Sequence, residues 1–435
     1  MLISSKINEG IKGSPKIPGD KSISHRSIII SSISNGKTEI KNILMSEDVM
    51  RTLDALKSMG VKIELNSKDV LVHGNGLLSL KKPEKEIDLG NSGTTARLLI
   101  GLLSAQNFNS YLFGDKSLSR RPMARIIDPV TTMGAKIKSN KKLLPITITG
   151  SNLIPIKYEL NVPSAQVKSG IALASLFLDG KTEIIEKFRT RNHTELMLEN
   201  FEADIKITEN SEKKHILING RKELIPKTIN ISNDISSAAF FIVAALINEK
   251  SDLELKNINI NPTRIGIINT LKKMGANILI KNKKNINGED VADIFVKYSI
   301  LNGCETNKDE AILMIDEFPI LAIAASFANS PSIFRGLSEL RIKESNRLKL
   351  IRDNLCICGI YSEINGDDLL IDPLKKISVK SNIIETNSDH RIAMSFLILG
   401  SKLGTDLNIK EAEFINTSFP FFKDIFNSVG GKLFE

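Results

Sequence analysis

The chain of 435 residues contains no tryptophan, and aromatic residues make up only 5% of it. Proteins that bind single-stranded nucleic acids stack the bases on aromatic side chains, so this scarcity argues against that class. The formal net charge is +9, but much of the excess lysine stands beside asparagine in short runs typical of solvated loops, such as 281–285 and 140–142. An acidic small substrate therefore explains the positive charge better than a nucleic acid does.

Cysteine is also rare. Cys304, Cys356 and Cys358 are the only three, an odd number that gives no disulfide framework and predicts a reducing compartment. No second pair or nearby histidine completes a metal site. Residues 1–6 lack the apolar core of a signal peptide, and the most apolar stretch, 238–247, is too short to cross a bilayer. We therefore expect a cytoplasmic protein without membrane contact.

The common motifs of nucleotide and metal chemistry are missing as well. The chain has no Walker loop, no GxGxxG sequence after a strand and no cluster of metal-ligating residues. Because these motifs supply the groups that hold a nucleotide or a metal, their absence excludes the commonest chemistries of both kinds. The sequence predicts no cofactor and no metal.

The most informative stretch that is present covers residues 18–27. A proline–glycine pair opens it and stops any preceding element. Asp20 or Ser22 can cap a helix there, since isoleucines of a buried face follow. A helix start attracts anions through its unpaired N–H groups and its dipole, and Lys21 and Arg26 add full charges. Alone, the stretch fits an anion site and a capped surface helix with solvated cations equally well.

The same pattern, a small or polar head before an apolar helix, returns every 70 to 82 residues. The heads are Asp20, Asn91, Ser164, Asp234, Asp316 and Ser388. A second signal, a helix that ends in glycine before an alternating strand, recurs at the far end of these units. Its clearest copies are at Gly60, Gly134, Gly275 and Gly430. Two independent signals at near-constant spacing predict six α/β units rather than an accidental repeat.

Six units divide naturally into three plus three, with a break near 232–234. If each set of three packs together, the six helix starts can line the two faces of one cleft. A generic α/β protein without true repeats is the alternative.

Six cations stand at predicted helix starts or in first turns, and Arg121 stands at a predicted helix start outside the six heads. The six cations are Lys21, Arg26, Arg121, Lys343, Arg347 and Arg391. Lys343 and Arg347 stand four residues apart, which predicts one face of a helix. The neighbouring carboxylates are Asp48, Asp316, Glu344 and Asp389. Singly, each cation can be an ordinary surface charge; together they suit a substrate with several phosphate or carboxylate groups. Two carboxylates in different environments can then serve as base and acid.

Six collinear motifs resemble those of one known family. They lie at 18–26, 90–94, 121–122, 164–166, 341–348 and 389–391. On these residues the chain is similar to the 5-enolpyruvylshikimate-3-phosphate (EPSP) synthases, from about residue 10 to 420. The amino-acid sequences of 164–168 and 314–322 most resemble those of the bacterial class II branch of the family.

The resemblance implies the two-lobed α/β enolpyruvyl transferase fold, an inside-out α/β barrel of six βαβαββ repeats in two domains of three. By the family pattern, 21–232 form the N-terminal lobe, and 1–20 with 233–435 form the C-terminal lobe. Hinge crossings are then expected near 18–21 and 232–235.

The resemblance also implies a transferase of the shikimate pathway, which leads to chorismate and the aromatic amino acids. The enolpyruvyl group of phosphoenolpyruvate passes to the 5-hydroxyl of shikimate 3-phosphate through a tetrahedral intermediate, and phosphate leaves. No cofactor takes part, and a monomer is expected.

The family pattern implies roles for single residues. Glu344 matches the proton donor, Asp316 the base, and Lys21 a catalytic contact. Shikimate 3-phosphate is held by Lys21, Ser22, Arg26, Ser164, Ala165, Gln166, Arg191, Asp316 and Lys343. Phosphoenolpyruvate is held by Lys21, Gly93, Arg121, Gln166, Arg347 and Arg391.

Two positions bear on how far the pattern carries over. Some relatives have a lysine where Thr417 stands, so one phosphate contact is absent or replaced. Gly93 stands where certain glyphosate-tolerant relatives carry alanine, which predicts that glyphosate competes with phosphoenolpyruvate here.

Two alternatives remain. The sister transferase that acts on UDP-N-acetylglucosamine uses a loop cysteine, but 90–125 contains none. The other is a basic, non-catalytic member of the fold that binds RNA. It predicts a strong, salt-dependent affinity for RNA, and replacing Glu344 would not affect its function.

Overall fold

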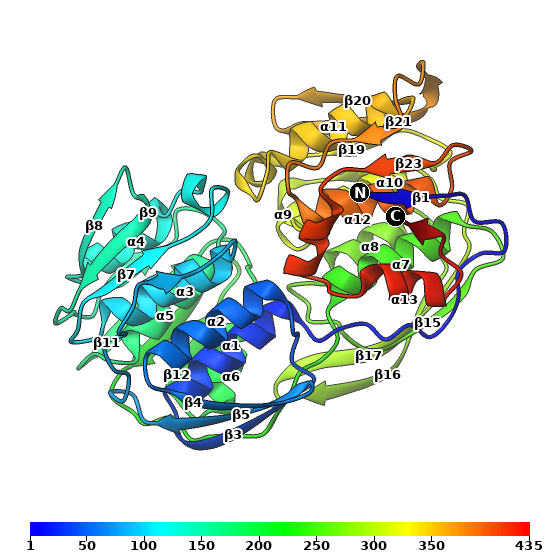
Figure 1. Ribbon diagram of the computed structural model, residues 1–435. Coiled ribbons are helices and arrows are strands. Elements are labelled where there is room, and N and C mark those ends of the chain that lie inside the picture. The colour runs from blue at the N-terminus through cyan, green and yellow to red at the C-terminus, as the bar shows by residue number, and fades with distance from the viewer. The chain divides into compact units, whose positions relative to one another are not determined.

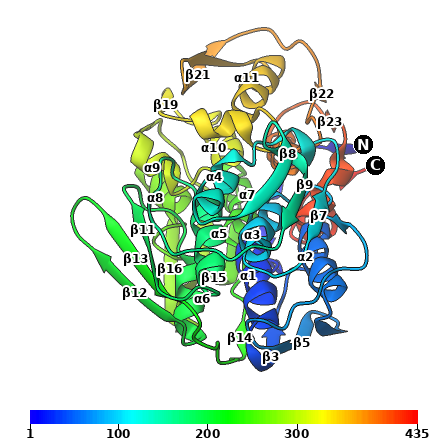
Figure 2. The same ribbon diagram turned by 90° about the vertical axis from the view of Figure 1, so that its left-hand side faces the viewer.

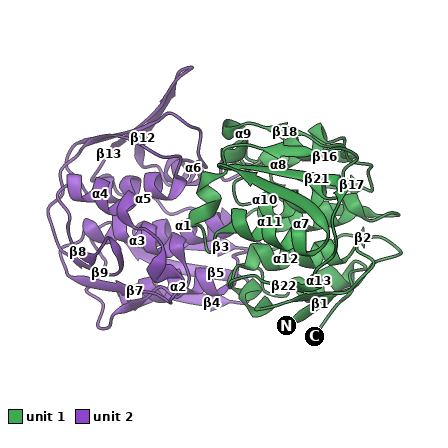
Figure 3. Ribbon diagram, turned by 90° about the horizontal axis from the view of Figure 1, so that it is seen from above, with its two compact units in different colours: residues 1–18, 232–285, 290–435 green, residues 19–231, 286–289 purple.

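The computed structural model describes all residues from 1 to 435. The chain forms two compact units, coloured separately in Figure 3. Unit 1 comprises 1–18, 232–285 and 290–435, and unit 2 comprises 19–231 and 286–289. Each unit has its own hydrophobic core. The lobes assigned from the family pattern, 21–232 and 1–20 with 233–435, stay a prediction about functional domains.

Unit 2 contains six helices and twelve strands, drawn in blue to green in Figure 1. Its helices are α1 (Lys21–Ser32), α2 (Glu47–Ser58), α3 (Gly93–Ser104), α4 (Ala124–Thr132), α5 (Ala165–Ser175) and α6 (His193–Asn200), with the 3-10 turn η1 (Leu118–Arg120). Its strands are β3 (Asn35–Lys41), β4 (Lys62–Asn66), β5 (Asp69–Asn75), β6 (Ile87–Asp88), β7 (Ser110–Phe113), β8 (Lys136–Asn140), β9 (Leu143–Thr149), β10 (Lys157–Glu159), β11 (Lys181–Glu186), β12 (Asp204–Glu209), β13 (Lys214–Asn219) and β14 (Ile229–Asn230).

Unit 1 contains the rest of the elements. Its helices are α7 (Ile235–Ile247), α8 (Gly266–Lys273), α9 (Lys308–Ile312), α10 (Phe318–Ala325), α11 (Arg347–Ile357), α12 (His390–Gly400) and α13 (Phe422–Ser428), with the 3-10 turns η2 (Ser338–Ile342) and η3 (Ala412–Thr417). Its strands are β1 (Leu2–Ser4), β2 (Lys12–Gly13), β15 (Asp252–Asn259), β16 (Ile278–Ile286), β17 (Glu289–Lys297), β18 (Glu305–Thr306), β19 (Ser332–Phe334), β20 (Ile360–Asn365), β21 (Asp368–Lys376), β22 (Ile383–Ile384), β23 (Leu407–Ile409) and β24 (Leu433–Phe434).

Six four-stranded sheets repeat one topology. In unit 2 the strand orders are β14-β3-β5-β4, β6-β7-β9-β8 and β10-β11-β13-β12; in unit 1 they are β16-β17-β15-β2, β18-β19-β21-β20 and β22-β23-β1-β24. Every sheet joins a parallel pair to an antiparallel pair, as β6-β7 and β7-β9 do. In the last sheet β1, from the N-terminus, lies between β23 and β24 (Figure 1). The predicted α/β fold of six repeats is therefore confirmed.

One buried helix from each repeat forms the centre of its unit. These helices are α1, α3 and α5 in unit 2, side by side in Figure 2, and α7, α10 and α12 in unit 1. All residues of α7 are buried, because no polar face interrupts its apolar sequence. Helices α3 and α5 approach backbone to backbone: a Cβ on Gly101 would lie 2.1 Å from the carbonyl oxygen of Gly170. Glycine is needed at that crossing.

Five of the six predicted helix starts are fixed by local side-chain caps; the sixth, near Asp316, has none, and α10 begins there at Phe318. Asp20, Ser92 and Ser164 accept hydrogen bonds from backbone N–H groups at the starts of α1, α3 and α5. Asp234 and Asp389 cap α7 and α12 in the same way. These caps place the buried helices with their N-termini at residues of the predicted motifs.

A hairpin of β16 and β17 carries its tip, 286–289, into unit 2, a feature that the repeat spacing did not predict. The tip is anchored there by two polar contacts. Glu289 Oε1 lies 2.6 Å from Nδ1 of His193, the first residue of α6. Asn287 Oδ1 accepts the backbone N–H of Asn230 at 2.8 Å.

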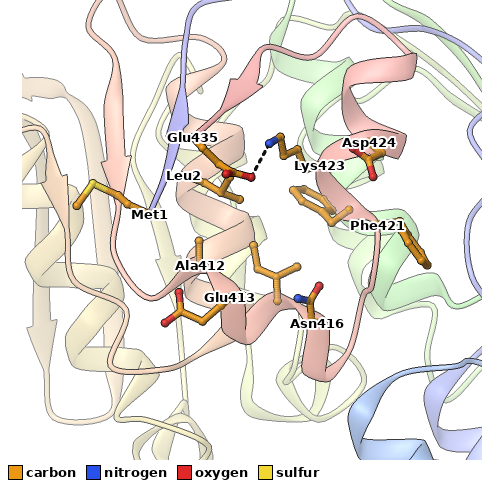
Figure 4. Close-up of a pocket in the computed structure, with 11 residues that line it drawn as sticks. Met1, Leu2, Ala412, Glu413, Asn416, Phe421, Lys423, Asp424 and Glu435 are labelled. Atoms are coloured by element: carbon orange, nitrogen blue, oxygen red, sulfur yellow. Dashed lines mark hydrogen bonds and ion pairs between the residues drawn. The ribbon is translucent and has the colours of Figure 1, made fainter.

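None of the helices has both the length and the apolar character needed to cross a membrane. Two surface cavities lie apart from the predicted site. One of about 660 Å³ in unit 1 is lined by both chain ends, η3 and the start of α13, with an ion pair between Lys423 and Glu435 (Figure 4). The other, of about 890 Å³, lies in unit 2 at the C-terminal ends of α3 and α5. No predicted site residue lines either cavity.

Candidate active site

The start of α1 brings three predicted residues together in unit 2. Lys21, Ser22 and Arg26 occupy its first turns, as the sequence predicted. The Lys21 Nζ atom lies 2.9 Å from Asp48 Oδ2, and both side chains are largely buried. This lysine is therefore held in place by a carboxylate from α2.

Arg26 is fixed more firmly than its position in the sequence indicates. Its Nη1 atom donates to the backbone oxygen of Ser22 at 3.0 Å. Its Nε and Nη2 atoms donate to the hydroxyls of Thr194 and Ser169, at 2.7 and 2.9 Å. The guanidinium is thus buried and oriented by Ser169 on α5 and Thr194 on α6.

The starts of α3 and α5 are joined by side chains. Gln166 accepts a hydrogen bond from Arg97 Nη1 at 2.9 Å and donates one to Thr94 Oγ1 at 2.9 Å. Ser164 caps α5 and Ala165 begins it. The predicted residues 164–166 therefore lie at a helix start that Gln166 joins to the first turns of α3.

Two more predicted cations of unit 2 lie in connecting segments. Arg121 directly follows η1, and α4 begins only at Ala124, so the expectation that Arg121 starts a helix is wrong. Its Nη2 atom donates instead to Asn91 Oδ1 at 2.6 Å, which draws it to the start of α3. Arg191 lies in the connection between β11 and α6 and is partly buried.

In unit 1 the predicted acid, base and cations form one cluster. Arg347 is 1% exposed and lies 2.8 Å from Asp389, 3.4 Å from Asp316 and 2.5 Å from Glu344. Lys343 Nζ lies 3.3 Å from Asp316 Oδ1. Burial by itself lowers the pKa of the Arg347 guanidinium, but the three carboxylates more than offset this and raise it further above its usual value.

Arg391 joins the same cluster from the start of α12. Its Nη1 atom donates to the backbone oxygen of Asp316 at 3.2 Å. The buried carboxylate of Glu317 lies 3.9 Å from the same atom. Thr417 donates to the backbone oxygen of Phe414 at 2.7 Å, and its hydroxyl lies 3.5 Å from Nδ1 of His390.

The predicted helical face of Lys343 and Arg347 is wrong. Lys343 follows η2, and α11 begins at Arg347. Asn346 caps α11 by accepting the backbone N–H of Lys349, which leaves 343–346 in a turn. The two cations still reach one carboxylate, Asp316, because the turn directs Lys343 to it.

The whole chain matches a family of known proteins. The model of the EPSP synthase (3-phosphoshikimate 1-carboxyvinyltransferase) family matches residues 6–426. A 3-phosphoshikimate 1-carboxyvinyltransferase of Ruthia magnifica subsp. Calyptogena magnifica is 45% identical over 98% of this chain and 97% of its own. The chain belongs to the EPSP synthase family. One of Thermoanaerobacter sp. (strain X514) is 44% identical over 98% of this chain and all of its own.

Solved structures agree with this family. An EPSP synthase from Acinetobacter baumannii is 42% identical, with a TM-score of 0.87 over all of this chain and 99% of its own. The enolpyruvyl transferase NikO from Streptomyces tendae, 14% identical with a TM-score of 0.78, shares the fold. The family and the enolpyruvyl transferase fold predicted from sequence are confirmed, and the two alternatives are not favoured.

Sequence reasoning missed the residues that orient the predicted ones in this EPSP synthase-family chain. They are Ser169, Thr194, Arg97 and Glu317. Each lies beside a motif in the sequence or contacts a motif residue in the structure. The neighbouring sequence, however, does not mark its side chain as one that orients a site residue. A polar residue inside an apolar helical pattern, such as Ser169 on α5, is the one signal that could have pointed to such a role.

A buried histidine near the start of α1 predicts how the stability of the fold depends on pH. His25 is fully buried with Nδ1 2.6 Å from Thr52 Oγ1, and burial, together with Lys21 and Arg26, holds its pKa well below the usual value. In the unfolded chain His25 binds a proton near pH 6.5, whereas in the folded chain it stays neutral at that pH. The free energy of unfolding therefore falls as the pH drops below about 6.5, by up to about 1.4 kcal/mol per pH unit. Thermal unfolding between pH 7.5 and 5.5 should show this fall reduced in His25→Gln. Identical slopes in wild type and His25→Gln would contradict the assignment.

Proposed function

We propose that this chain transfers the enolpyruvyl group of phosphoenolpyruvate to the 5-hydroxyl of shikimate 3-phosphate and releases phosphate. The family match over 6–426 supports this activity. The observation that carries the residue assignment is the cluster in unit 1, where Arg347 contacts both Asp316 and Glu344. Two carboxylates that share a buried arginine are candidates for an acid and a base acting on neighbouring atoms.

The proposed chemistry uses these two carboxyl groups twice. Glu344, as acid, protonates the methylene carbon of phosphoenolpyruvate, and the adjacent carbon becomes electrophilic. Asp316 takes the proton of the 5-hydroxyl while that oxygen attacks this carbon, which gives the tetrahedral intermediate. In the second step Glu344, now a carboxylate, removes a proton from the new methyl group, and the double bond re-forms. The carbon–oxygen bond to phosphate breaks as Asp316 gives its proton to the leaving phosphate. Each proton transfer contributes roughly 10²–10⁴-fold to the rate.

The remaining assigned residues hold the two anionic substrates. In this proposal shikimate 3-phosphate is bound by Lys21, Ser22, Arg26, Ser164, Ala165, Gln166, Arg191, Asp316 and Lys343. Phosphoenolpyruvate is bound by Lys21, Gly93, Arg121, Gln166, Arg347 and Arg391. Support comes from the helix starts of α1, α3, α5 and α12, which present backbone N–H groups beside these cations. Positioning of two reactants contributes up to about 7–11 kcal/mol.

The direct test is phosphate release by the purified chain. We expect turnover with shikimate 3-phosphate and phosphoenolpyruvate together, and none with either alone. Replacing shikimate 3-phosphate by UDP-N-acetylglucosamine should abolish release, and turnover with that acceptor would favour the sister transferase. Strong, salt-dependent RNA binding without any turnover would favour the non-catalytic alternative. A monomeric state and a cytoplasmic location remain proposals.

Glyphosate inhibition is a further prediction that rests on Gly93. A Cβ at this position would lie 2.8 Å from Arg97 Nη1 and 3.1 Å from Arg121 Nη1, so both guanidinium groups would have to move. Because Arg121 is assigned to phosphoenolpyruvate, we expect Gly93→Ala to raise the KM for this substrate by about tenfold, as small displacements of a positioning group do. The glyphosate concentration for half inhibition should rise more.

Gly404→Ala is the matched control, since nothing lies within 4 Å of a Cβ there. It should leave the KM and the inhibition unchanged. A wild type that is unaffected by millimolar glyphosate would refute the competition.

A further inference from the structure

Unit 2 contains a buried ion cluster that the proposed mechanism does not use. Lys168 on α5 is only 1% exposed, and its Nζ atom lies 2.9 Å from Glu186 and 2.7 Å from Glu195. Both carboxylates are equally buried. Lys214 Nζ approaches Glu195 at 3.3 Å, so two cations balance two anions.

The cluster is ionised and therefore costly to bury. Burial lowers the pKa of Lys168, but Glu195 and Glu186 more than offset this and raise it above the usual value. Burial likewise raises the pKa of Glu195, yet the charges of Lys168 and Lys214 bring it below the usual value. Apolar side chains of similar size often stabilise a fold as well as such a cluster does. Fold stability alone gives a weak reason for charges here.

One side of the cluster reaches the segment that carries Arg191. Glu186 is the last residue of β11, and its second oxygen, Oε1, accepts the hydroxyl of Thr190 at 2.5 Å. Thr190 is buried and directly precedes Arg191. The carboxylate that binds Lys168 thus also holds the side chain of Thr190, the residue before Arg191.

The other side reaches Arg26. Lys168 and Glu195 are the chain neighbours of Ser169 and Thr194, whose hydroxyls lie 2.6 Å apart. These two hydroxyls accept the Nη2 and Nε hydrogen bonds of Arg26. The Lys168–Glu195 pair therefore joins α5 to α6 at the point where they orient the guanidinium.

We propose that Lys168, Glu186 and Glu195 are positioning residues for shikimate 3-phosphate, which act through Thr190 on Arg191 and through Ser169 and Thr194 on Arg26. This inference rests on the proposed function, since it takes both arginines as ligands of that substrate. The ion cluster touches no substrate itself. It sets where two substrate-binding cations lie in unit 2.

The test removes the connecting hydroxyls instead of the buried charges, because variants of the cluster itself risk misfolding. Thr190→Val and Thr194→Val keep the side-chain shape and lose the hydrogen bonds. We expect the KM for shikimate 3-phosphate to rise about three- to tenfold in each, the loss of one hydrogen bond. The KM for phosphoenolpyruvate and kcat should change less than twofold. Thr190→Ser and Thr194→Ser should restore the wild-type KM.

Thr182→Val is the matched control: this threonine of β11 is equally buried, and its hydroxyl has no partner. Its KM values should equal those of the wild type. A lower melting temperature in the two valine variants without a change in KM would overturn the inference and leave a merely structural role. Wild-type protein that releases no phosphate would instead overturn the proposed function, so the two failures are distinguishable.

Discussion

Glu344→Gln and Asp316→Asn should each lose most turnover and keep their fold. Both substitutions keep the size of the side chain and remove its ability to transfer a proton. We expect kcat to fall roughly 10²–10⁴-fold, the contribution of one general acid or base. The KM for phosphoenolpyruvate should change little, because the cations assigned to it remain. Asp316→Asn should also raise the KM for shikimate 3-phosphate, since Asp316 is assigned to that substrate as well.

The measurement is phosphate release at saturating concentrations of both substrates, with the melting temperature as a check on folding. Glu344 and Asp316 are about a fifth exposed, so the loss of their contacts to Arg347 should lower stability only modestly. Glu363→Gln on the exposed strand β20 is the control and should keep full activity. A near-normal rate in either active-site variant would remove that residue from the mechanism.

The features that could be predicted from the sequence are local. Asp20, Ser92 and Ser164 stand next to the helices that they cap, so a short window of sequence is enough to place the start of each helix. The repeat of these starts predicted the six-repeat fold for the same reason. The motifs at these three starts also contain half of the assigned site residues.

The features that could not be predicted depend on distant residues or on competing local ones. Arg26 and Thr194 are 168 residues apart, and nothing in the sequence near either residue indicates that the two form a hydrogen bond. Lys168 reads as a surface lysine of a helix, because only the tertiary fold brings two glutamates to it. The turn at Lys343 arises because the cap at Asn346 overrides helical spacing. The spacing of two cations could not reveal that.

Arg347 is the group on which the unit 1 cluster depends, so Arg347→Met should have the largest effect on stability. Three carboxylates lie within 3.4 Å of its guanidinium, and methionine fills the space without the charge. The loss of the positive charge would destabilise Asp389 most, because its side chain is fully buried and could not be hydrated instead. We expect the free energy of unfolding to fall by about 3–5 kcal/mol, the cost of leaving a buried charge without its partner. Activity should also be lost, because Arg347 is assigned to phosphoenolpyruvate.

Arg352→Met on the same helix is the matched control. Arg352 is 40% exposed and pairs with its neighbour Asp353 at 3.1 Å, so the same change there should cost no more than about 1 kcal/mol. Urea unfolding followed by a probe in unit 1 separates the two variants. If Arg347→Met unfolded at the same urea concentration as Arg352→Met, the carboxylates would not depend on Arg347, and its place at the centre of the acid–base cluster would have to be abandoned. Lower stability combined with normal turnover would keep the structural role and withdraw Arg347 from substrate binding.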